Sequence, residues 1–262
     1  MNPLRRCIAL AALLLAPCAH GLVVRHDVDE WTFIRLASRY PATVMFHPAG
    51  REDDLIAMGT LIHPRWILTA AHVAETLDVG DLAEVGREMI KIDAVVLSPG
   101  WQGFHRREDH QRDIALVRLA APATRVGPAR LYTRADEVGC EVTFVGRGSV
   151  GTGLTGPVHD TALMRAATNR VEKAEGSGLQ FRFDAPGDAG ITPLEGISGE
   201  GDSGGPAFCM RDGVTWLIGV SSSQDARPAG RQVGHYGVLE YYSRVSSFAE
   251  WIRSTIRNDA LR

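Results

Sequence analysis

A glycine-rich turn carries the side chain best suited to covalent chemistry. The segment Gly201-Asp202-Ser203-Gly204-Gly205-Pro206 places a serine between glycines. Because glycine has no Cβ, the chain can turn sharply there, and a substrate carbonyl can come close to main-chain N–H groups. Ser203 is therefore a candidate nucleophile, although glycine-rich turns that contain serine also join strands in hairpins.

A serine hydroxyl needs a base to activate it, and the base needs an acid to orient it. Two upstream segments offer these groups. His72 closes Thr69-Ala70-Ala71-His72, directly after the apolar run 66–68, so the imidazole emerges where a buried strand ends. Asp113 opens another apolar run, Asp113-Ile114-Ala115-Leu116, where a half-buried carboxylate can accept from an imidazole N–H. Singly, each is also typical of a strand cap or a turn; together they predict a Ser-His-Asp site.

These three segments resemble the T-A-A-H, D-I-A-L and G-D-S-G-G-P motifs of the chymotrypsin-like (trypsin-fold) serine proteases, in the same order. Residues 61–68 resemble the strand that leads into the family histidine, and residues 242–252 its closing strand and helix. The resemblance covers most of the chain after about residue 40, except the loop from about 170 to 199. It implies a serine endopeptidase that hydrolyses proteins or peptides.

The resemblance also implies a role for each residue. His72 is the general base and later the general acid, while Asp113 fixes its tautomer. Ser203 forms the covalent acyl-enzyme, and the main-chain N–H groups of Gly201 and Ser203 form the oxyanion hole. This chemistry needs no cofactor, and we expect none.

Short apolar and β-branched runs, separated by glycine and proline, predict an all-β fold. They span residues 42–46, 55–62, 89–97, 114–119, 141–145, 179–183, 205–210 and 216–221. One amphipathic helix is expected at the end, where Val245, Phe248, Ala249, Ile252 and Ile256 repeat at helical spacing. The resemblance implies two six-stranded antiparallel β-barrels, 22–125 and 126–262, which meet in a proline-rich segment, 120–128.

The N-terminus has the pattern of a signal peptide, which we assign to residues 1–21. Arg5-Arg6 precedes an apolar stretch from Cys7 to Ala16, and small residues follow it. The stretch is too short for a membrane span, so we expect a secreted or periplasmic protein. Lipidation at Cys18 is an alternative, which the preceding Pro17 disfavours.

Outside the leader, only two cysteines remain, Cys140 and Cys209. The family resemblance implies that they form a disulfide, since its second cysteine lies six residues after the nucleophile and its first opens a strand. Two separate buried thiols are the alternative. Val73 follows His72 where animal members usually have a cysteine, and a single bridge indicates a bacterial member.

In the resembling family, the residue six positions before the nucleophile lines the primary substrate pocket, and an aspartate there selects lysine or arginine. Here this residue is Ile197. Glu240, two residues before Tyr242, aligns with another position at the pocket base. If its carboxylate faces the pocket, we expect basic side chains at the cleaved residue. The alternative is that the unmatched loop shifts the register and Glu240 points to solvent.

Asp202 is the expected partner of a freed N-terminal amine, because the family carboxylate beside the nucleophile forms that pair after proteolytic processing. Leu22-Val23-Val24 offers such a terminus once the leader is removed. Arg25-His26 replaces the glycine pair that usually follows. A charged and bulky segment would therefore have to enter the cleft.

The overall composition agrees with a globular enzyme, at 262 residues, 45% hydrophobic residues and a formal net charge of −3. Nucleic-acid binding is not expected, because the charge run 106–109 is of mixed sign. We expect a monomer. A metal site is not expected either, since the histidines lack ligand spacing (His63, His105, His110, His159), although a calcium loop at 78–88 is conceivable by family analogy.

Two other functions fit part of the sequence. Gly201 to Gly205 also satisfies the G-x-S-x-G turn of α/β-hydrolases, which would make the protein an esterase. That turn requires a helix after the serine, with the acid and histidine downstream, whereas here both lie upstream. A catalytically silent binding protein on a protease scaffold is the second alternative, but all three candidate catalytic residues are present.

Overall fold

The computed structural model describes residues 22–104, 112–159 and 163–261. The expected signal peptide at 1–21, with Cys18, therefore lies outside the described residues, and so do His105 and His110. Within these three ranges, no helix is long and apolar enough to cross a membrane.

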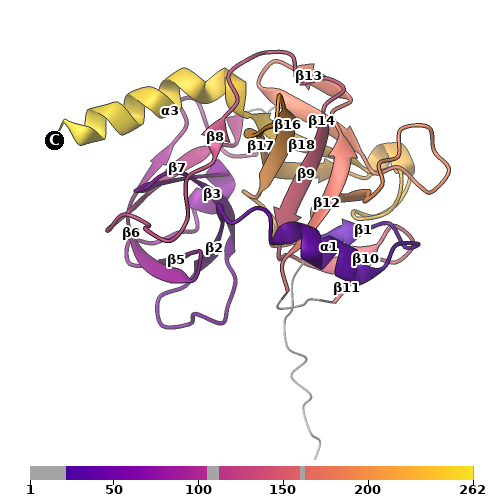
Figure 1. Cartoon of the computed structure of the whole chain (residues 1–262), viewed down its shortest axis with the longest axis horizontal. Helices are drawn as coiled ribbons and strands as arrows, with labels where there is room; N and C mark the ends of the chain where they lie inside the picture. Colours follow the sequence, from indigo (N-terminus) through magenta and orange to yellow (C-terminus); the bar gives the residue numbers. More distant parts are fainter. Residues whose placement is uncertain (1–21, 105–111, 160–162, 262) are drawn as a thin grey trace, which may run out of the picture.

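The N-terminal half forms a closed six-stranded barrel, with strand order β2-β3-β4-β7-β6-β5 (Figure 1). Its strands are β2 (Thr43–His47), β3 (Ala57–His63), β4 (Trp66–Thr69), β5 (Leu82–Val85), β6 (Glu88–Leu97) and β7 (Ala115–Leu119). Val44, Phe46, Ile67 and Leu116 are fully buried and fill the barrel. Gly59 is required because a Cβ there would lie 2.7 Å from the Ile67 side chain. The barrel interior is therefore tightly packed at this position.

The C-terminal half is an eight-stranded sheet that curls without closing. Its order is β12-β9-β16-β17-β18-β14-β13, and β8 pairs with β17. The strands are β8 (Arg130–Leu131), β9 (Glu141–Gly146), β12 (Arg165–Arg170), β13 (Lys173–Glu175), β14 (Gly178–Arg182), β16 (Pro206–Arg211), β17 (Val214–Asp225) and β18 (Leu239–Arg244). Three aromatic rings meet in its core. Phe144 stacks on Tyr242, with ring centres 4.8 Å apart, and meets Phe181 edge to face at 5.0 Å. The all-β class predicted from the sequence is confirmed.

The first described residues pack on the C-terminal half, although the predicted boundary placed 22–37 with the first barrel. Strand β1 (Val23–Val24) joins a small sheet of order β11-β10-β1-β15. The other strands of this sheet are β10 (Val150–Thr152), β11 (Gly156–His159) and β15 (Gly196–Ile197). Helix α1 (Glu30–Ala37) lies against β12 (Figure 1). The reason is apolar burial, because Leu22 and Phe33 enter the same cluster as Phe144 and Phe181.

The expected C-terminal helix is confirmed as α3 (Val245–Ala260). It buries Val245, Phe248, Ala249 and Ile252, the residues that repeat at helical spacing. Figure 1 shows α3 extending from the curled sheet across the first barrel. An ion pair between Arg118 in β7 and Asp259 in α3 joins the two halves there. Two short elements complete the fold, α2 (Ala71–Ala74) and η2 (Arg227–Ala229).

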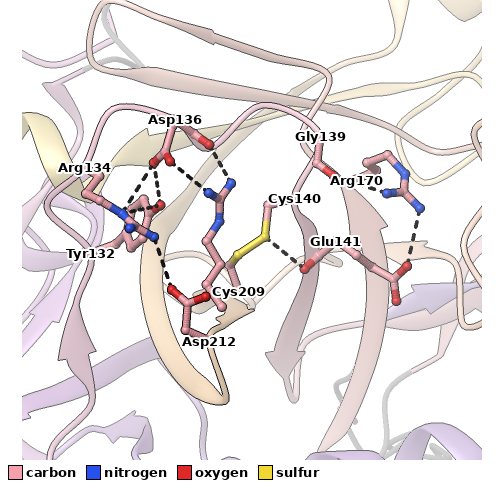
Figure 2. Close-up of a disulfide and its surroundings, with 10 residues drawn as sticks. Tyr132, Arg134, Asp136, Gly139, Cys140, Glu141, Arg170, Cys209 and Asp212 are labelled. Carbon is pink, nitrogen blue, oxygen red and sulfur yellow. Dashed lines mark hydrogen bonds and ion pairs between the residues drawn. A yellow bond between two sulfur atoms is a disulfide. The ribbon is translucent and has the colours of Figure 1, made fainter.

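The predicted disulfide between Cys140 and Cys209 is confirmed, with 6.4 Å between the two Cα atoms. It joins the start of β9 to β16, which are neighbouring strands of the curled sheet. Figure 2 shows the bridge beside a cluster of Tyr132, Arg134 and Asp136. Cys209 is buried, which shields its sulfur from solvent.

Candidate active site

His72 and Asp113 form a close pair at one end of the first barrel. Imidazole Nδ1 lies 2.7 Å from Asp113 Oδ2, and the main-chain N–H of His72 donates to Oδ1 at 2.9 Å. The strands dictate this meeting, since β4 pairs with β7 and Thr69 is level with Ala115. His72 follows β4 and Asp113 precedes β7. The pair therefore lies at one edge of two adjacent strands.

Asp113 is fully buried and held from three sides. Besides the two bonds from His72, the Ser222 hydroxyl donates to Oδ2 at 2.6 Å. The Ser243 hydroxyl donates to the main-chain oxygen of Asp113 at 2.7 Å. Ser222 lies in β17 and Ser243 in β18, so the curled sheet completes the environment of an acid that the barrel supplies. A buried carboxylate with this many donors has a fixed orientation.

The turn that carries Ser203 packs directly against the segment before His72. The main-chain N–H of Met58 donates to the main-chain carbonyl oxygen of Ser203 at 2.9 Å. Gly204 has φ +79°, and a Cβ there would overlap the Thr69 hydroxyl and crowd the main-chain nitrogen of Ala70. Only glycine allows this approach. The serine is thus brought beside the chain that ends in His72.

The same turn leaves two main-chain donors unused. Among the described residues, none accepts a hydrogen bond from the N–H of Gly201 or from that of Ser203. Gly201 has φ +91°, a conformation that favours glycine. Such free, preorganised donors beside a nucleophile are suited to hold a developing oxyanion.

Asp202 points away from the cleft and into the protein. It is 1% exposed and accepts from the N–H of Gly148 and, at 2.8 Å, from that of Gly199. Burial raises the pKa of Asp202 to about 7, because removal from water disfavours the charged form more than the main-chain donors and Arg165 favour it. The carboxylate would therefore gain from a nearby cation.

The chain from Leu22 runs toward this carboxylate. Val23 pairs in parallel with Gly151 and antiparallel with Ile197, so β1 lies between β10 and β15. Following both registers back by one residue brings Leu22 level with Val150 and Ser198. Gly148 and Gly199, which both donate to Asp202, lie just beyond them. Leu22 is itself 1% exposed.

Arg25 and His26 do not obstruct this arrangement, because both side chains bind outside it. Arg25 Nη1 donates to the Thr192 carbonyl at 3.1 Å, and its Nε donates to Asp27 at 2.7 Å. This ion pair lowers the pKa of Asp27 to about 2. His26 Nδ1 lies 2.8 Å from the Tyr236 hydroxyl. Arg25 and His26, which stand where the family usually has two glycines, thus bind the loops that carry Thr192 and Tyr236.

A cavity of about 310 Å³ opens beside the serine. Its lining includes Ser198, Ser203, Ser222, Gln224, Val233 and Glu240. Glu240 is 1% exposed, and one of its oxygens accepts from the Ser198 N–H at 3.0 Å. Burial raises the pKa of this carboxyl to about 8, because little in the cavity compensates its charge. The alternative in which Glu240 points to solvent does not match this position.

Ile197 does not line the cavity, contrary to its alignment with the pocket. It is fully buried and packs with Val23, Phe183 and Val238. Neighbouring residues along a strand point to opposite sides, and Ser198 takes the cavity side instead.

Gln224 is a cavity residue that the sequence analysis missed. Its amide nitrogen donates to the Ser198 carbonyl at 2.6 Å, and its oxygen accepts from the Gly234 N–H at 3.1 Å. The amide thereby bridges two walls of the cavity. In the hairpin register, Gln224 is directly opposite Glu240. Knowledge of how β17 pairs with β18 would have identified it.

Within the described parts of the chain, no three His, Cys, Asp or Glu residues are arranged to hold a metal ion. The acids of the loop considered for calcium already accept other bonds. Asp81 accepts from the N–H groups of Ala49 and Asp78, and Glu88 from the Thr124 hydroxyl. Strand β16 follows the serine directly, so the helix that an α/β-hydrolase turn requires is absent there.

The curled sheet, the closed barrel and the pair of a part-exposed His72 with a buried Asp113, near a glycine-bounded serine, define a chymotrypsin-like serine protease. The chain matches the family described as Trypsin over residues 36–252, and it belongs to this family. Human (Homo sapiens) kallikrein-11 is 28% identical over 219 residues, which cover 79% of this chain and 74% of that protein. Snake venom serine proteinase 14 of Crotalus adamanteus is 29% identical over 223 residues, 78% of this chain and 79% of that protein.

Among solved structures, neuropsin, a serine protease expressed in the limbic system of mouse brain, superposes with a TM-score of 0.65. It is 21% identical, and the match covers 89% of this chain and 98% of that one. This likeness shows the fold. Together with the family membership, it makes the protein a serine endopeptidase, a hydrolase whose substrates are peptides.

Proposed function

We propose that the protein cleaves peptide bonds through a triad of Ser203, His72 and Asp113 and a covalent acyl-enzyme. The observation that carries this proposal is the 2.7 Å contact between His72 Nδ1 and the fully buried Asp113. The packing of the Ser203 turn on the segment that leads to His72 supports it. With Nδ1 occupied by the acid, the second ring nitrogen is the one available to act as a base.

In the first half of the reaction, His72 takes the proton of the Ser203 hydroxyl while the oxygen attacks the substrate carbonyl. The negative charge moves to the carbonyl oxygen, where the N–H groups of Gly201 and Ser203 stabilise it. His72 then gives the proton to the leaving amine as the C–N bond breaks. Water repeats the sequence on the ester and restores the serine.

The cavity supports a preference for basic side chains at the cleaved residue. A lysine or arginine that enters it would meet Glu240 at its base and be a counter-ion for the buried carboxylate. Ile197 has no part in this recognition, because it packs on the other side of β15.

We further propose that Asp202 pairs with the amine of Leu22 after removal of residues 1–21. The register of β1 and the need of Asp202 for a cation support this pairing. Such processing belongs to an exported protein, secreted or periplasmic, and the Cys140–Cys209 bridge agrees with an oxidising compartment. A bacterial origin and a monomeric state stay predictions.

Replacement of the nucleophile tests the catalytic proposal. Ser203→Ala should lower kcat on a peptide substrate by on the order of 10⁶, because the triad acts as a unit. It should also prevent labelling by a fluorophosphonate, while circular dichroism stays that of the parent. Undiminished peptidase activity in the purified variant would overturn the assignment. Intact folding of the parent without labelling would instead favour a silent binding protein.

A further inference from the structure

Arg147 lies beside the catalytic turn, and the proposed mechanism does not use it. It follows β9 and precedes Gly148, whose N–H donates to Asp202. One residue further on, the Ser149 N–H donates to the Glu200 carbonyl at 2.6 Å. The chain at Arg147 thus runs alongside the segment that leads into Ser203.

The guanidinium of Arg147 has poor partners. Its Nη1 donates only to the thioether sulfur of Met45, at 3.5 Å. Its Nε is buried and has no hydrogen-bond partner among the described residues. Thioether sulfur is a weak acceptor, and a buried donor without a partner is costly. The side chain is nevertheless part-exposed, so an external group can reach it.

Among the described contacts, no carboxylate forms an ion pair with Arg147. Glu84 feels its charge, but the pKa of Glu84 is lowered first by its hydrogen bond to His47 and less by Arg147. Glu84 lies 3.5 Å from His47 Nε2 and forms no ion pair with Arg147 among the described contacts. The site therefore suits an added anion.

The position of Arg147 relative to Ser203 decides which part of a substrate meets it. On one side of the serine, the main-chain N–H of Gly204 donates to the carbonyl oxygen of Ser221, which lines the cavity. On the other side, the carbonyl oxygen of Ser203 accepts from the main-chain N–H of Met58, and Met45 is the strand partner of Met58. If the side chain of the acyl part occupies the cavity, the departing part of the peptide lies on the side of Met58, next to Met45 and Arg147.

We infer that Arg147 is a specificity-determining residue that binds a carboxylate in the departing part of the substrate. The carboxylate is either an acidic side chain close after the cleaved bond or the C-terminal carboxylate of a short departing segment. Guanidinium groups recognise both through paired N–H donors. The inference rests on the proposed acyl-enzyme function and adds a preference on the side of the cleft opposite the cavity.

Acyl transfer to added dipeptides tests this inference. An ester substrate forms the acyl-enzyme, and a dipeptide amine then competes with water. The amine attacks the acyl carbon, a peptide bond forms, and Ser203 leaves with the proton that His72 returns. The measured quantity is the ratio of peptide product to hydrolysis product, for Ala-Asp-amide, Ala-Asn-amide, Ala-Lys-amide and Ala-Ala with a free carboxylate.

In the parent enzyme at low salt, Ala-Asp-amide should give about three- to fivefold more transfer than Ala-Asn-amide, the range of a partly exposed ion pair. If Ala-Ala with a free carboxylate exceeds Ala-Ala-amide, measured alongside it, by the same factor, a C-terminal carboxylate is also bound. If it does not, only acidic side chains are. Added salt should reduce the preference.

Arg147→Met should abolish the preference, Arg147→Lys should retain part of it, and Arg147→Glu should reverse it in favour of Ala-Lys-amide. Arg39→Met, which removes an exposed arginine at a cavity that Ser203 does not line, is the matched control and should change nothing. Turnover with equal transfer to the acidic and neutral dipeptides would overturn this inference alone. Absence of ester turnover in the parent would count against the proposed function instead.

Discussion

The two halves of the molecule contribute to the cleft in different ways. The closed barrel supplies His72 and Asp113 from the ends of two adjacent strands, and their pairing follows from the strand register. The C-terminal half supplies the cavity walls from β17, β18 and the segment that follows β15. In this cavity, the types of side chain along the strands, rather than the strand ends, determine which groups face a substrate. The backbone thus fixes the His72–Asp113 pair, whereas the chemistry of the cavity depends on which side chains stand at its lining positions.

The two buried acids of the cleft illustrate the difference. Asp113 accepts from a main-chain N–H, an imidazole and a hydroxyl. Glu240 is equally buried, but its donors come mainly from Ser198, and burial raises its pKa to about 8. We conclude that hydrogen bonds fix the orientation of the first acid, while the second can change its charge with pH and with the bound substrate.

The largest effect is expected where the barrel fixes the acid. Asp113→Asn should lower kcat by on the order of 10⁴, the magnitude known for this change in serine proteases, because the amide cannot hold the imidazole in its reactive tautomer. Ser222→Ala is the matched comparison, since it removes one donor to the same oxygen. It should cost about tenfold, in the range of a hydrogen bond to a charged group. Steady-state kinetics on one peptide substrate, with melting curves for both variants, compare the two. Similar losses would mean that the sheet matters as much as the barrel.

A smaller loss is expected when Asp202 lacks its cation. Extra residues before Leu22, or Asp202→Asn, should reduce kcat/KM by about 10²- to 10³-fold, because an uncompensated buried pair member costs about 3–5 kcal/mol. N-terminal sequencing of the active enzyme and kinetics of the extended form provide the measurement. Equal activity of the extended and processed forms would mean that the oxyanion site is preformed and that Asp202 needs no terminal amine.

Much of the barrel could be predicted from the sequence because its signals are local. Apolar runs marked the strands, and the T-A-A-H and D-I-A-L segments put His72 and Asp113 at strand ends. The glycines around Ser203 likewise indicated a close approach, which the contact between Gly204 and Thr69 shows. In each case, neighbouring residues carry the information.

The pocket could be predicted only in part, because its residues meet through long-range pairing. Counting back from Ser203 reached Ile197, but the pairing of β15 with β1 turns this side chain away from the cavity. Gln224 has no local motif and becomes visible only through its register with Glu240. The position of residues 22–37 on the curled sheet was missed for the same reason, since their partners lie more than a hundred residues away.

The smallest effect that we predict is a pH dependence of substrate preference, which arises from Glu240 in the C-terminal half and not from the first barrel. In the empty cavity the pKa of Glu240 is about 8, so its carboxyl is mostly neutral at pH 7 and charged at pH 9. Ionisation creates the counter-ion for a basic side chain. The ratio of kcat/KM for a substrate with lysine at the cleaved residue to that for one with glutamine should therefore rise with pH. Effects of pH on the shared catalytic step change kcat/KM for both substrates alike and cancel in the ratio.

We expect this ratio to increase between pH 7 and 9 by up to about tenfold. Over this range, the charged fraction of a carboxyl with a pKa of about 8 rises from about one tenth to about nine tenths. Glu240→Gln should remove the increase and lower the preference for lysine at every pH, because the amide cannot ionise. Gln224→Ala is the matched control in the same cavity, since it removes the bridging amide but leaves the titrating group. Its ratio should still rise with pH. A flat ratio in the parent enzyme, or a preference for large apolar side chains at pH 9, would show that Glu240 does not select the substrate and that the cavity recognises side chains through its neutral groups.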